Sequence, residues 1–230
     1  ITVIHEGIDV DIVKPIEDAS LLLQKKDGDR KETLTKNNKV ITFLNRNLEP
    51  YRGYHIFIRS LPDIIKKHPD AYILIIGKDG VSYGATPKKG SYKDIYYNEI
   101  KDKIPNDHNI RFLGHIPYDV MLNIFSISTA HIYLTYPFVL SWSMLEAMSC
   151  EALILGSKTP PIQEVIQDNK NGLLFDFHSP KELSSLANKV LDNPERYQNI
   201  KKNARKSIID KYELGKCLDM QMKLVKDLLK

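Results

Sequence analysis

The chain has 230 residues, of which 42% are hydrophobic and 27% are charged. These proportions are ordinary for a soluble globular protein, and this length corresponds to one or two domains. The formal net charge of +4 is too small to indicate a nucleic-acid-binding protein. No apolar run approaches the ~20 residues that a membrane-spanning helix requires.

The two cysteines and the first residues bear on the context of the chain. Cys150 and Cys217 lie in apolar or helical surroundings, which favours a reducing compartment over a disulfide scaffold. The chain begins Ile1-Thr2-Val3-Ile4, without a methionine or a signal-peptide pattern, in what is predicted to be a strand. We therefore expect a fragment, in which a function that needs two domains is only half present.

The remaining elements follow in chain order. Residues 15–38 are dense in charge and contain one apolar patch, so we expect a solvated connection there. Beyond them, short apolar runs alternate with segments of helical periodicity. Because the strands are apolar throughout, they favour a parallel sheet with helices on both faces. The predicted strands are 40–44, 71–76, 110–113, 130–134, 153–156 and 173–175, and the predicted helices are 56–67, 92–104, 118–125, 144–148, 181–191, 195–209 and 214–229.

The first candidate binding motif follows the strand at 40–44. Parallel sheets bind ligands outside the carboxyl ends of their strands, so this loop is well placed for a site. Arg46 and Arg52 lie six residues apart in it, and each offers a planar, permanently charged fork that matches phosphate oxygens. Gly53 would allow a close approach of the backbone. The alternative is two solvated arginines in a surface loop.

The second motif, Phe138 to Glu146, follows the strand at 130–134 and opens a helix. A helix N-terminus offers free N–H groups and the positive end of a dipole, which suit an anion. Glu146 has two interpretations. With Ser143 it fits a capping box, in which the glutamate bonds back to the Ser143 N–H. Alternatively, its carboxylate accepts hydrogen bonds from a sugar diol.

Other motifs carry weaker signals. The loop Gly77–Gly84 is rich in glycine but fits neither a dinucleotide-binding nor a P-loop pattern, so it is interpreted as a flexible turn. The histidines lack metal-ligand spacing. Asp9-x-Asp11 and Asp27-x-Asp29 are pairs of the kind that hold a divalent cation beside a diphosphate, but a structural role is favoured for both.

Taken in order, these segments resemble the nucleotide-sugar-binding half of the GT-B glycosyltransferases, specifically the large retaining family 4 (group 1). Each match alone is weak, and the specificity lies in their order and spacing. His5–Asp9 with Pro15 resembles N-G-V-D…P, Arg46 with Arg52-Gly53 resembles G-R…K-G, Ile75–Gly77 resembles I-x-G, Arg111–Gly114 resembles V-x-F-L-G, Glu146–Met148 resembles the end of L-E-A-M, and Glu164–Leu174 resembles E-I-V-x-D-G-x-N-G-L-L.

The resemblance implies a Rossmann-like fold, with residues 1–194 as the donor-binding domain and residues 195–230 as a helical tail. It also implies that the N-terminal acceptor domain is absent. The implied catalytic residues are Arg46, Arg52 and Glu146. In this assignment the arginines hold the donor diphosphate, Arg52 replaces the usual lysine, and Glu146 binds the ribose hydroxyls. The implied donor-binding set adds Gly53, Gly77, Thr135 and Phe138. It also includes Leu113, Gly114 and His115, which would lie near the base. The N–H groups of Ser141, Trp142, Ser143 and Met144 would lie near the pyrophosphate.

One departure from the family is serious. Its E-x7-E pattern begins with a glutamate near the donor sugar, and here that position is Phe138. The usual G-F-G is replaced by Val139-Leu140-Ser141. Either Thr135, Tyr136 or Ser141 takes over the role, or the protein binds nucleotide without efficient transfer.

The resemblance implies retaining, metal-independent transfer of a sugar from a UDP- or GDP-sugar, without a cofactor. The acceptor would be a glycan or lipid-linked glycan bound through the missing domain, in surface polysaccharide biosynthesis. The implied location is the cytoplasm, with peripheral contact of the full-length protein with the inner face of the membrane. The alternatives are a nucleotide-sugar 2-epimerase of GT-B form and a non-catalytic nucleotide-sugar-binding module.

Overall fold

The computed structural model describes residues 3–24 and 31–229, and within them six parallel strands form one sheet in the order β5-β4-β3-β6-β7-β8. This confirms the predicted α/β class. The six strands predicted from residue 40 onward are all present, with ends displaced by a few residues at most. The strands are β3 (Val40–Asn47), β4 (Tyr72–Lys78), β5 (Ile110–Gly114), β6 (Ala130–Tyr133), β7 (Ile154–Ser157) and β8 (Leu173–Phe175).

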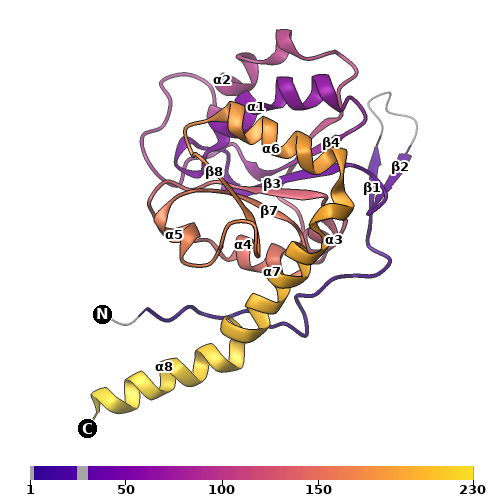
Figure 1. Cartoon of the computed structure of the whole chain (residues 1–230). Helices are drawn as coiled ribbons and strands as arrows, with labels where there is room; N and C mark the ends of the chain where they lie inside the picture. The colour runs from indigo at the N-terminus through magenta and orange to yellow at the C-terminus, as the bar shows by residue number, and fades with distance from the viewer. Residues whose placement is uncertain (1–2, 25–30, 230) are drawn as a thin grey trace.

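Helices cover both faces of this sheet (Figure 1). Helices α1 (Tyr54–Lys67) and α6 (Pro180–Asp192) pack on one face, where Phe43, Phe57 and Leu183 share a buried cluster. On the other face, α3 (Tyr118–Ile127), α4 (Trp142–Ser149) and α7 (Gln198–Lys211) contribute to a second buried cluster. The apolar stripe of each helix therefore meets an apolar face of the sheet, which explains why the strands carry no polar alternation.

The shorter helices differ from their predicted extents. Helix α2 (Tyr92–Asn98) is followed by the 3₁₀ turn η2 (Lys101–Lys103), where one helix was expected over 92–104. The helix expected over 195–209 is divided into η3 (Pro194–Tyr197) and α7. Helix α5 (Pro160–Gln163) was not predicted, because its single turn is too short to show a period.

The expected solvated connection over residues 15–38 is wrong. Strands β1 (Ser20–Gln24) and β2 (Lys31–Thr35) form an antiparallel pair within it, with Ser20 opposite Thr35. Leu23 and Leu34 are buried against the sheet and α3. Lys31, Thr33 and Thr35 lie on the other face of β2, because successive side chains of a strand point to opposite faces. Glu32 shares the face of Leu34 and accepts from the Tyr72 hydroxyl at 2.8 Å. The pair Asp27-x-Asp29 lies outside the described residues.

The N-terminal segment also differs from its prediction. Ile1 and Thr2 lie outside the described residues, and residues 3–7 contain no strand. The Ile8 N–H donates to the carbonyl of Tyr212 at 2.7 Å, and the Leu214 N–H donates to the carbonyl of Ile8 at 2.9 Å. This segment is thus held at the junction of α7 and α8 (Leu214–Leu228), and α8 projects away from the body (Figure 1).

The order of the strands places a crevice at the centre of the sheet. From β3 the chain continues outward through β4 and β5, and from β6 it continues outward on the other side through β7 and β8. Strands β3 and β6 are neighbours, so the loops that follow them diverge. This reversal is the topological switch point at which open α/β sheets bind ligands.

Candidate functional site

The first cavity at the crevice lies between the loops that follow β3 and β6. Its volume is about 420 Å³, and the residues that line it include Arg46, Arg52, Ser141, Trp142 and Ser143. These residues come from the first and second candidate motifs, which are almost a hundred residues apart in the sequence. The fold therefore brings together both groups that were expected to hold a diphosphate.

A second cavity of about 570 Å³ adjoins the first, and Arg46 lines both. It lies at the ends of β3, β4 and β5, where Gly77, Gly114 and His115 line it. Gly114 has a φ of 64°, and the space around the position of a Cβ atom is open there. Of the three residues expected near the base of the nucleotide, Gly114 and His115 thus line this space with Arg46, and Leu113 does not line it.

Arg52 is held firmly in place. Its guanidinium is buried, and Nη1 donates to Oγ1 of Thr135 and to the carbonyl of Val139, both at 2.9 Å. The Cζ atom lies 5.5 Å from the ring centroids of both Tyr83 and Phe138. The alternative of a solvated surface arginine is therefore excluded for Arg52, whereas the side chain of Arg46 is exposed.

Gly53 shapes the turn that carries Arg52. Its φ is 71°, and a Cβ atom there would lie 2.3 Å from the Cβ of Leu134. The close approach that this glycine permits is thus to the end of β6. Asn45 supports the same turn, because its side-chain amide donates to the carbonyl of Arg52 at 3.5 Å. The turn is fixed against the sheet before any ligand binds.

The glycine-rich loop after β4 is anchored by Glu49, a residue to which the sequence assigned no role. Glu49 is only 1% exposed, and its Oε2 accepts from the N–H groups of Ser82 at 2.6 Å and Tyr83 at 3.1 Å. These bonds hold the Tyr83 ring beside Arg52. The loop is therefore a defined part of the site, and the prediction of a simple turn missed its role because no local pattern links Glu49 to it.

The N-terminus of α4 faces the first cavity. Ser141 is the residue that precedes the helix, and its side chain bonds to the Ser143 hydroxyl at 2.7 Å and caps no backbone N–H. Its own N–H donates to the hydroxyl of Tyr133 at 2.7 Å. The first amides inside a helix have no acceptor in the helix itself, so the start of α4 suits an anion.

The structure decides between the two interpretations of Glu146. No capping box forms, because the helix begins after Ser141 and the Glu146 carboxylate faces Tyr118 instead of Ser143. The Tyr118 hydroxyl donates to Oε1 of Glu146 at 2.7 Å. Burial raises the pKa of Glu146, and the bond from Tyr118 lowers it. Tyr118 lines the second cavity, so the Glu146 carboxylate lies behind a residue of its wall.

The remaining predicted residues lie at different depths. The side chains of Thr135 and Met144 are fully buried, the first against Arg52 and the second in the core. At Gly77, a Cβ atom would lie 2.8 Å from the carbonyl oxygen of Asn45. Phe138 is 36% exposed and lines a third cavity of about 790 Å³ with the N-terminal segment. Leu113 is half-buried.

Within residues 3–24 and 31–229, no three His, Cys, Asp or Glu side chains gather in a way that would hold a metal ion. Oδ1 of Asp9 accepts from the N–H groups of Asp11 and Ile12, which is a local turn. The helices of the same ranges are all too short or too polar to cross a membrane.

A doubly wound parallel sheet with a ligand crevice at its switch point defines a Rossmann-like α/β protein. The family model "Glycosyl transferases group 1" matches residues 25–207, and the chain belongs to this family. This confirms the resemblance to group 1 glycosyltransferases that the sequence predicted.

Individual proteins agree with this assignment. The chain is 26% identical to the spore coat protein SA of Bacillus subtilis over 179 residues, which are 77% of this chain and 46% of that protein. It spans about half the length of the relatives that it matches.

Two solved structures share the fold. The C-terminal domain of the glycosyl transferase group 1 family protein LpcC from Francisella tularensis has a TM-score of 0.72 and 20% identity, with 90% of this chain and 100% of that chain covered. Anabaena Alr3699/HepE, solved in complex with UDP and glucose, has a TM-score of 0.75 and 17% identity, with 98% of this chain and 57% of that chain covered.

Proposed function

We propose that this chain is the donor-binding part of a retaining glycosyltransferase that transfers a sugar from a nucleoside-diphosphate sugar, without requiring a metal. The observation that carries the proposal is the first cavity, in which Arg46, Arg52 and the start of α4 converge. A planar guanidinium and free helix N–H groups are both suited to phosphate oxygens.

Arg46 and Arg52 are the proposed catalytic cations. When the anomeric bond breaks, negative charge develops on the leaving diphosphate. Fixed donors aimed at a developing oxyanion contribute about 3–4 kcal/mol each in well-studied enzymes. Because Arg52 is already fixed by Thr135 and Val139, it meets this charge without reorganisation. In this proposal the two arginines supply the positive charge that a metal supplies elsewhere.

Glu146 is the proposed ribose-binding residue, and the second cavity is the proposed space for the base. A carboxylate accepts hydrogen bonds from two hydroxyl groups, which suits the diol of a ribose. The complex of Alr3699/HepE with UDP and glucose supports the assignment of a nucleoside-diphosphate sugar as the donor. Gly77 and Gly114 line this cavity and add no side chain to its wall.

The whole protein's reaction is also a proposal. Retention, a glycan or lipid-linked acceptor, a role in surface polysaccharide synthesis and work at the cytoplasmic face of a membrane all follow from the family resemblance. The match to a separately solved C-terminal domain, which covers 90% of this chain, supports treating this chain as a donor-binding domain with the acceptor domain on another part of the full-length protein. The boundary at residue 194 between this domain and a tail stays a prediction.

A panel of nucleotides tests the donor assignment. A ligand that binds only the folded state raises its free energy of unfolding by about 2.7 kcal/mol at a hundred times its Kd. We expect UDP or GDP to raise the melting temperature of the chain, and adenosine to leave it unchanged. A panel in which no nucleoside diphosphate raises the melting temperature contradicts the proposal.

Product analysis of the full-length protein separates the three candidate activities. A transferase needs an acceptor to consume the nucleotide sugar, whereas an epimerase converts it without one. A non-catalytic module does neither, and Phe138 in place of a carboxylate is the residue that favours this alternative. We expect acceptor-dependent release of UDP or GDP, and acceptor-independent conversion of the sugar contradicts the transferase assignment.

A further inference from the structure

We propose that Tyr83 and Phe138 form an aromatic clamp that positions the Arg52 guanidinium for the donor diphosphate. The term aromatic clamp denotes these two rings only. The inference rests on the proposed function, because it concerns how the proposed phosphate-binding arginine is oriented. It assigns positioning roles to two residues, one of which replaces a carboxylate of the family pattern.

The geometry of the clamp is symmetric about Arg52. Its Cζ atom lies 5.5 Å from the centroid of each ring, and the two rings meet edge to face at 4.7 Å with an interplanar angle of 63°. A guanidinium within about 6 Å of a ring centroid is attracted by the quadrupole of the ring. The two centroids are 4.7 Å apart while each lies 5.5 Å from Cζ, so both rings lie on the same side of the guanidinium and form one aromatic wall against it.

The hydrogen bonds of Arg52 complete the arrangement. Nη1 donates to Thr135 and to Val139, which fixes one corner of the guanidinium. An arginine has five N–H donors. Within the described residues, the donors of Arg52 other than those of Nη1 stay available for a ligand. The clamp attracts the charged group from one side, and the two bonds of Nη1 fix its orientation.

The two rings come from separate strand ends. Arg52 follows β3, Tyr83 lies in the loop after β4, and Phe138 lies in the loop after β6. The buried Glu49 carboxylate holds the backbone of Tyr83 in place. The clamp therefore joins the two sides of the switch point. An arginine that is ordered before binding loses less side-chain entropy on meeting a diphosphate.

Phe138 keeps more exposure than a residue placed only for packing requires. It is 36% exposed and lines the third cavity, while Tyr83 lines the first. Arg52 thus stands at a boundary between two open spaces, where an aromatic face adds an attraction for the cation that an aliphatic side chain of similar size lacks.

The test compares Phe138→Leu and Phe138→Tyr with the wild-type chain by calorimetry, using UDP, UMP and inorganic diphosphate as probes. Leucine keeps an apolar side chain but removes the ring face, and tyrosine keeps the ring. We expect Phe138→Leu to bind UDP and diphosphate about tenfold more weakly, with a smaller change for UMP, and Phe138→Tyr to restore binding. Tyr83→Leu and Tyr83→Phe form a second pair with the same expectation.

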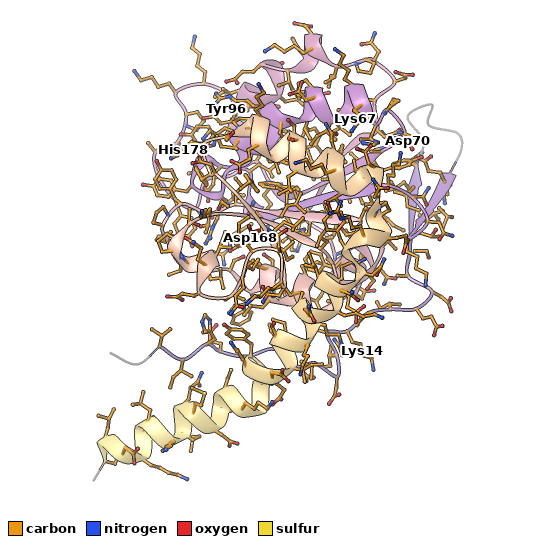
Figure 2. All side chains as sticks on the ribbon, in the orientation of Figure 1. Lys14, Lys67, Asp70, Tyr96, Asp168 and His178 are labelled. Atoms are coloured by element: carbon orange, nitrogen blue, oxygen red, sulfur yellow. The ribbon has the colours of Figure 1, made fainter. Side chains whose placement is uncertain are left out.

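Tyr96→Leu is the matched control. The Cζ of Arg59 lies 5.3 Å from the Tyr96 ring, so this variant removes the same kind of contact elsewhere. Figure 2 labels Tyr96 on the flank of the molecule that also carries His178, and neither residue lines the first cavity. We expect its affinity for UDP to equal that of the wild-type chain.

The outcomes are distinct. The clamp is wrong, and the donor assignment stands, if Phe138→Leu binds UDP as tightly as the wild-type chain does. The same holds if the affinities of this variant for UDP and UMP fall equally. If the wild-type chain binds none of the three probes, the donor assignment fails. In that case NMR of the Arg52 Nε–H still tests the clamp, since its order should fall in Phe138→Leu and persist in Phe138→Tyr. Equal order in both variants overturns it.

Discussion

At the scale of single residues, Arg52 is the group on which the proposed function depends most. Its guanidinium is buried beside two aromatic rings and bonded at Nη1, and it lines the cavity shared with Arg46 and the start of α4. Such a group is ordered in the absence of a ligand. Its replacement should therefore alter binding of the diphosphate more than the replacement of an exposed arginine.

The first prediction concerns Arg52→Ala. Loss of a charge-assisted hydrogen bond to phosphate costs about 1.5–3 kcal/mol, which corresponds to an affinity for UDP or GDP about 10- to 150-fold lower by calorimetry. Arg52→Lys keeps the charge but not the fork, so its affinity should be intermediate. The control is Arg59→Ala, because Arg59 pairs with Glu99 far from the cavity. Unchanged affinity in Arg52→Ala would sink the phosphate assignment.

The second prediction concerns Glu146→Gln. The neutral amide accepts hydrogen bonds less strongly than a carboxylate, so the affinity for UDP or GDP should fall by about 5- to 20-fold. Binding of inorganic diphosphate should stay the same, because it has no ribose. Tyr118→Phe distinguishes the role of the hydrogen-bond partner from that of the carboxylate, because it removes only the bond to Oε1 of Glu146. Equal losses for nucleotide and diphosphate in Glu146→Gln would contradict the ribose assignment.

At the scale of elements, the turn between β3 and α1 is set by its contact with β6. Gly53 has the left-handed φ that an L-residue adopts only at a cost, and it leaves no room for a Cβ beside Leu134. This contact fixes the position of Arg52 relative to the sheet. The segments that follow β3 and β6 therefore pack closely against each other at the switch point.

The third prediction compares Gly53→Ala with Gly90→Ala. Both glycines have similar φ values, 71° and 67°, but a Cβ at Gly90 meets nothing within 4 Å. Gly90→Ala should lower the free energy of unfolding by about 1 kcal/mol through backbone strain alone. Gly53→Ala should lower it by about 3 kcal/mol, because overpacking against Leu134 adds to the strain. Urea denaturation measures both, and equal losses would show that the contact is unimportant.

Residues 15–38 show why an element was missed. The charge density of this segment suggested a connection in solvent, yet β1 and β2 pair and bury Leu23 and Leu34. A strand needs apolar residues on only one face, so two buried leucines are enough to fix its register against the core. Composition averages over both faces and therefore hides such an edge hairpin.

At the scale of the whole molecule, the buried core contains a histidine that resists protonation. His131 lies in β6, with Nδ1 2.8 Å from the Thr42 hydroxyl and with Nε2 lacking a partner among the described residues. Full burial lowers the pKa of His131 to about 3. Burial, and after it Arg59, lowers the pKa of His55 to about 4. The unfolded chain binds these protons near pH 6.5.

The fourth prediction is a pH dependence of stability. Below pH 6.5 the unfolded state binds more protons than the folded state, so the free energy of unfolding falls as the pH falls toward 3. His131 alone contributes a slope of up to about 1.4 kcal/mol per pH unit between pH 5.5 and 4.5. His131→Asn should reduce the slope by that amount in urea denaturation, whatever its absolute stability. Parallel slopes for the two proteins would contradict this role.

The two C-terminal helices, α7 and α8, differ in how closely they pack on the rest of the chain. Ala204 and Ile208 of α7 are part of the core, and Arg205 donates from Nη1 to the carbonyl of Ser149 at 2.6 Å. Helix α8 projects from the body, and its side chains extend on all sides of it (Figure 2). Several of its apolar side chains are exposed. The predicted helical tail, residues 195–230, thus divides into α7, which packs in the core, and α8, which projects from it. The exposed apolar residues of this helix are Leu218, Met220, Met222, Leu224, Val225 and Leu228.

The sequence by itself determined the class of fold, the strands of the sheet and the two arginines and the glutamate at its edge. These follow from local apolar periodicity and from motifs in one stretch of chain, which a sequence carries openly. Only the tertiary structure decided that Glu146 faces Tyr118 instead of capping its helix, and that Glu49 holds the loop of Tyr83. It alone set Arg52 beside the paired rings of Tyr83 and Phe138. Such contacts join strand ends that lie far apart in the chain, and their geometry is fixed by the packing of the whole sheet.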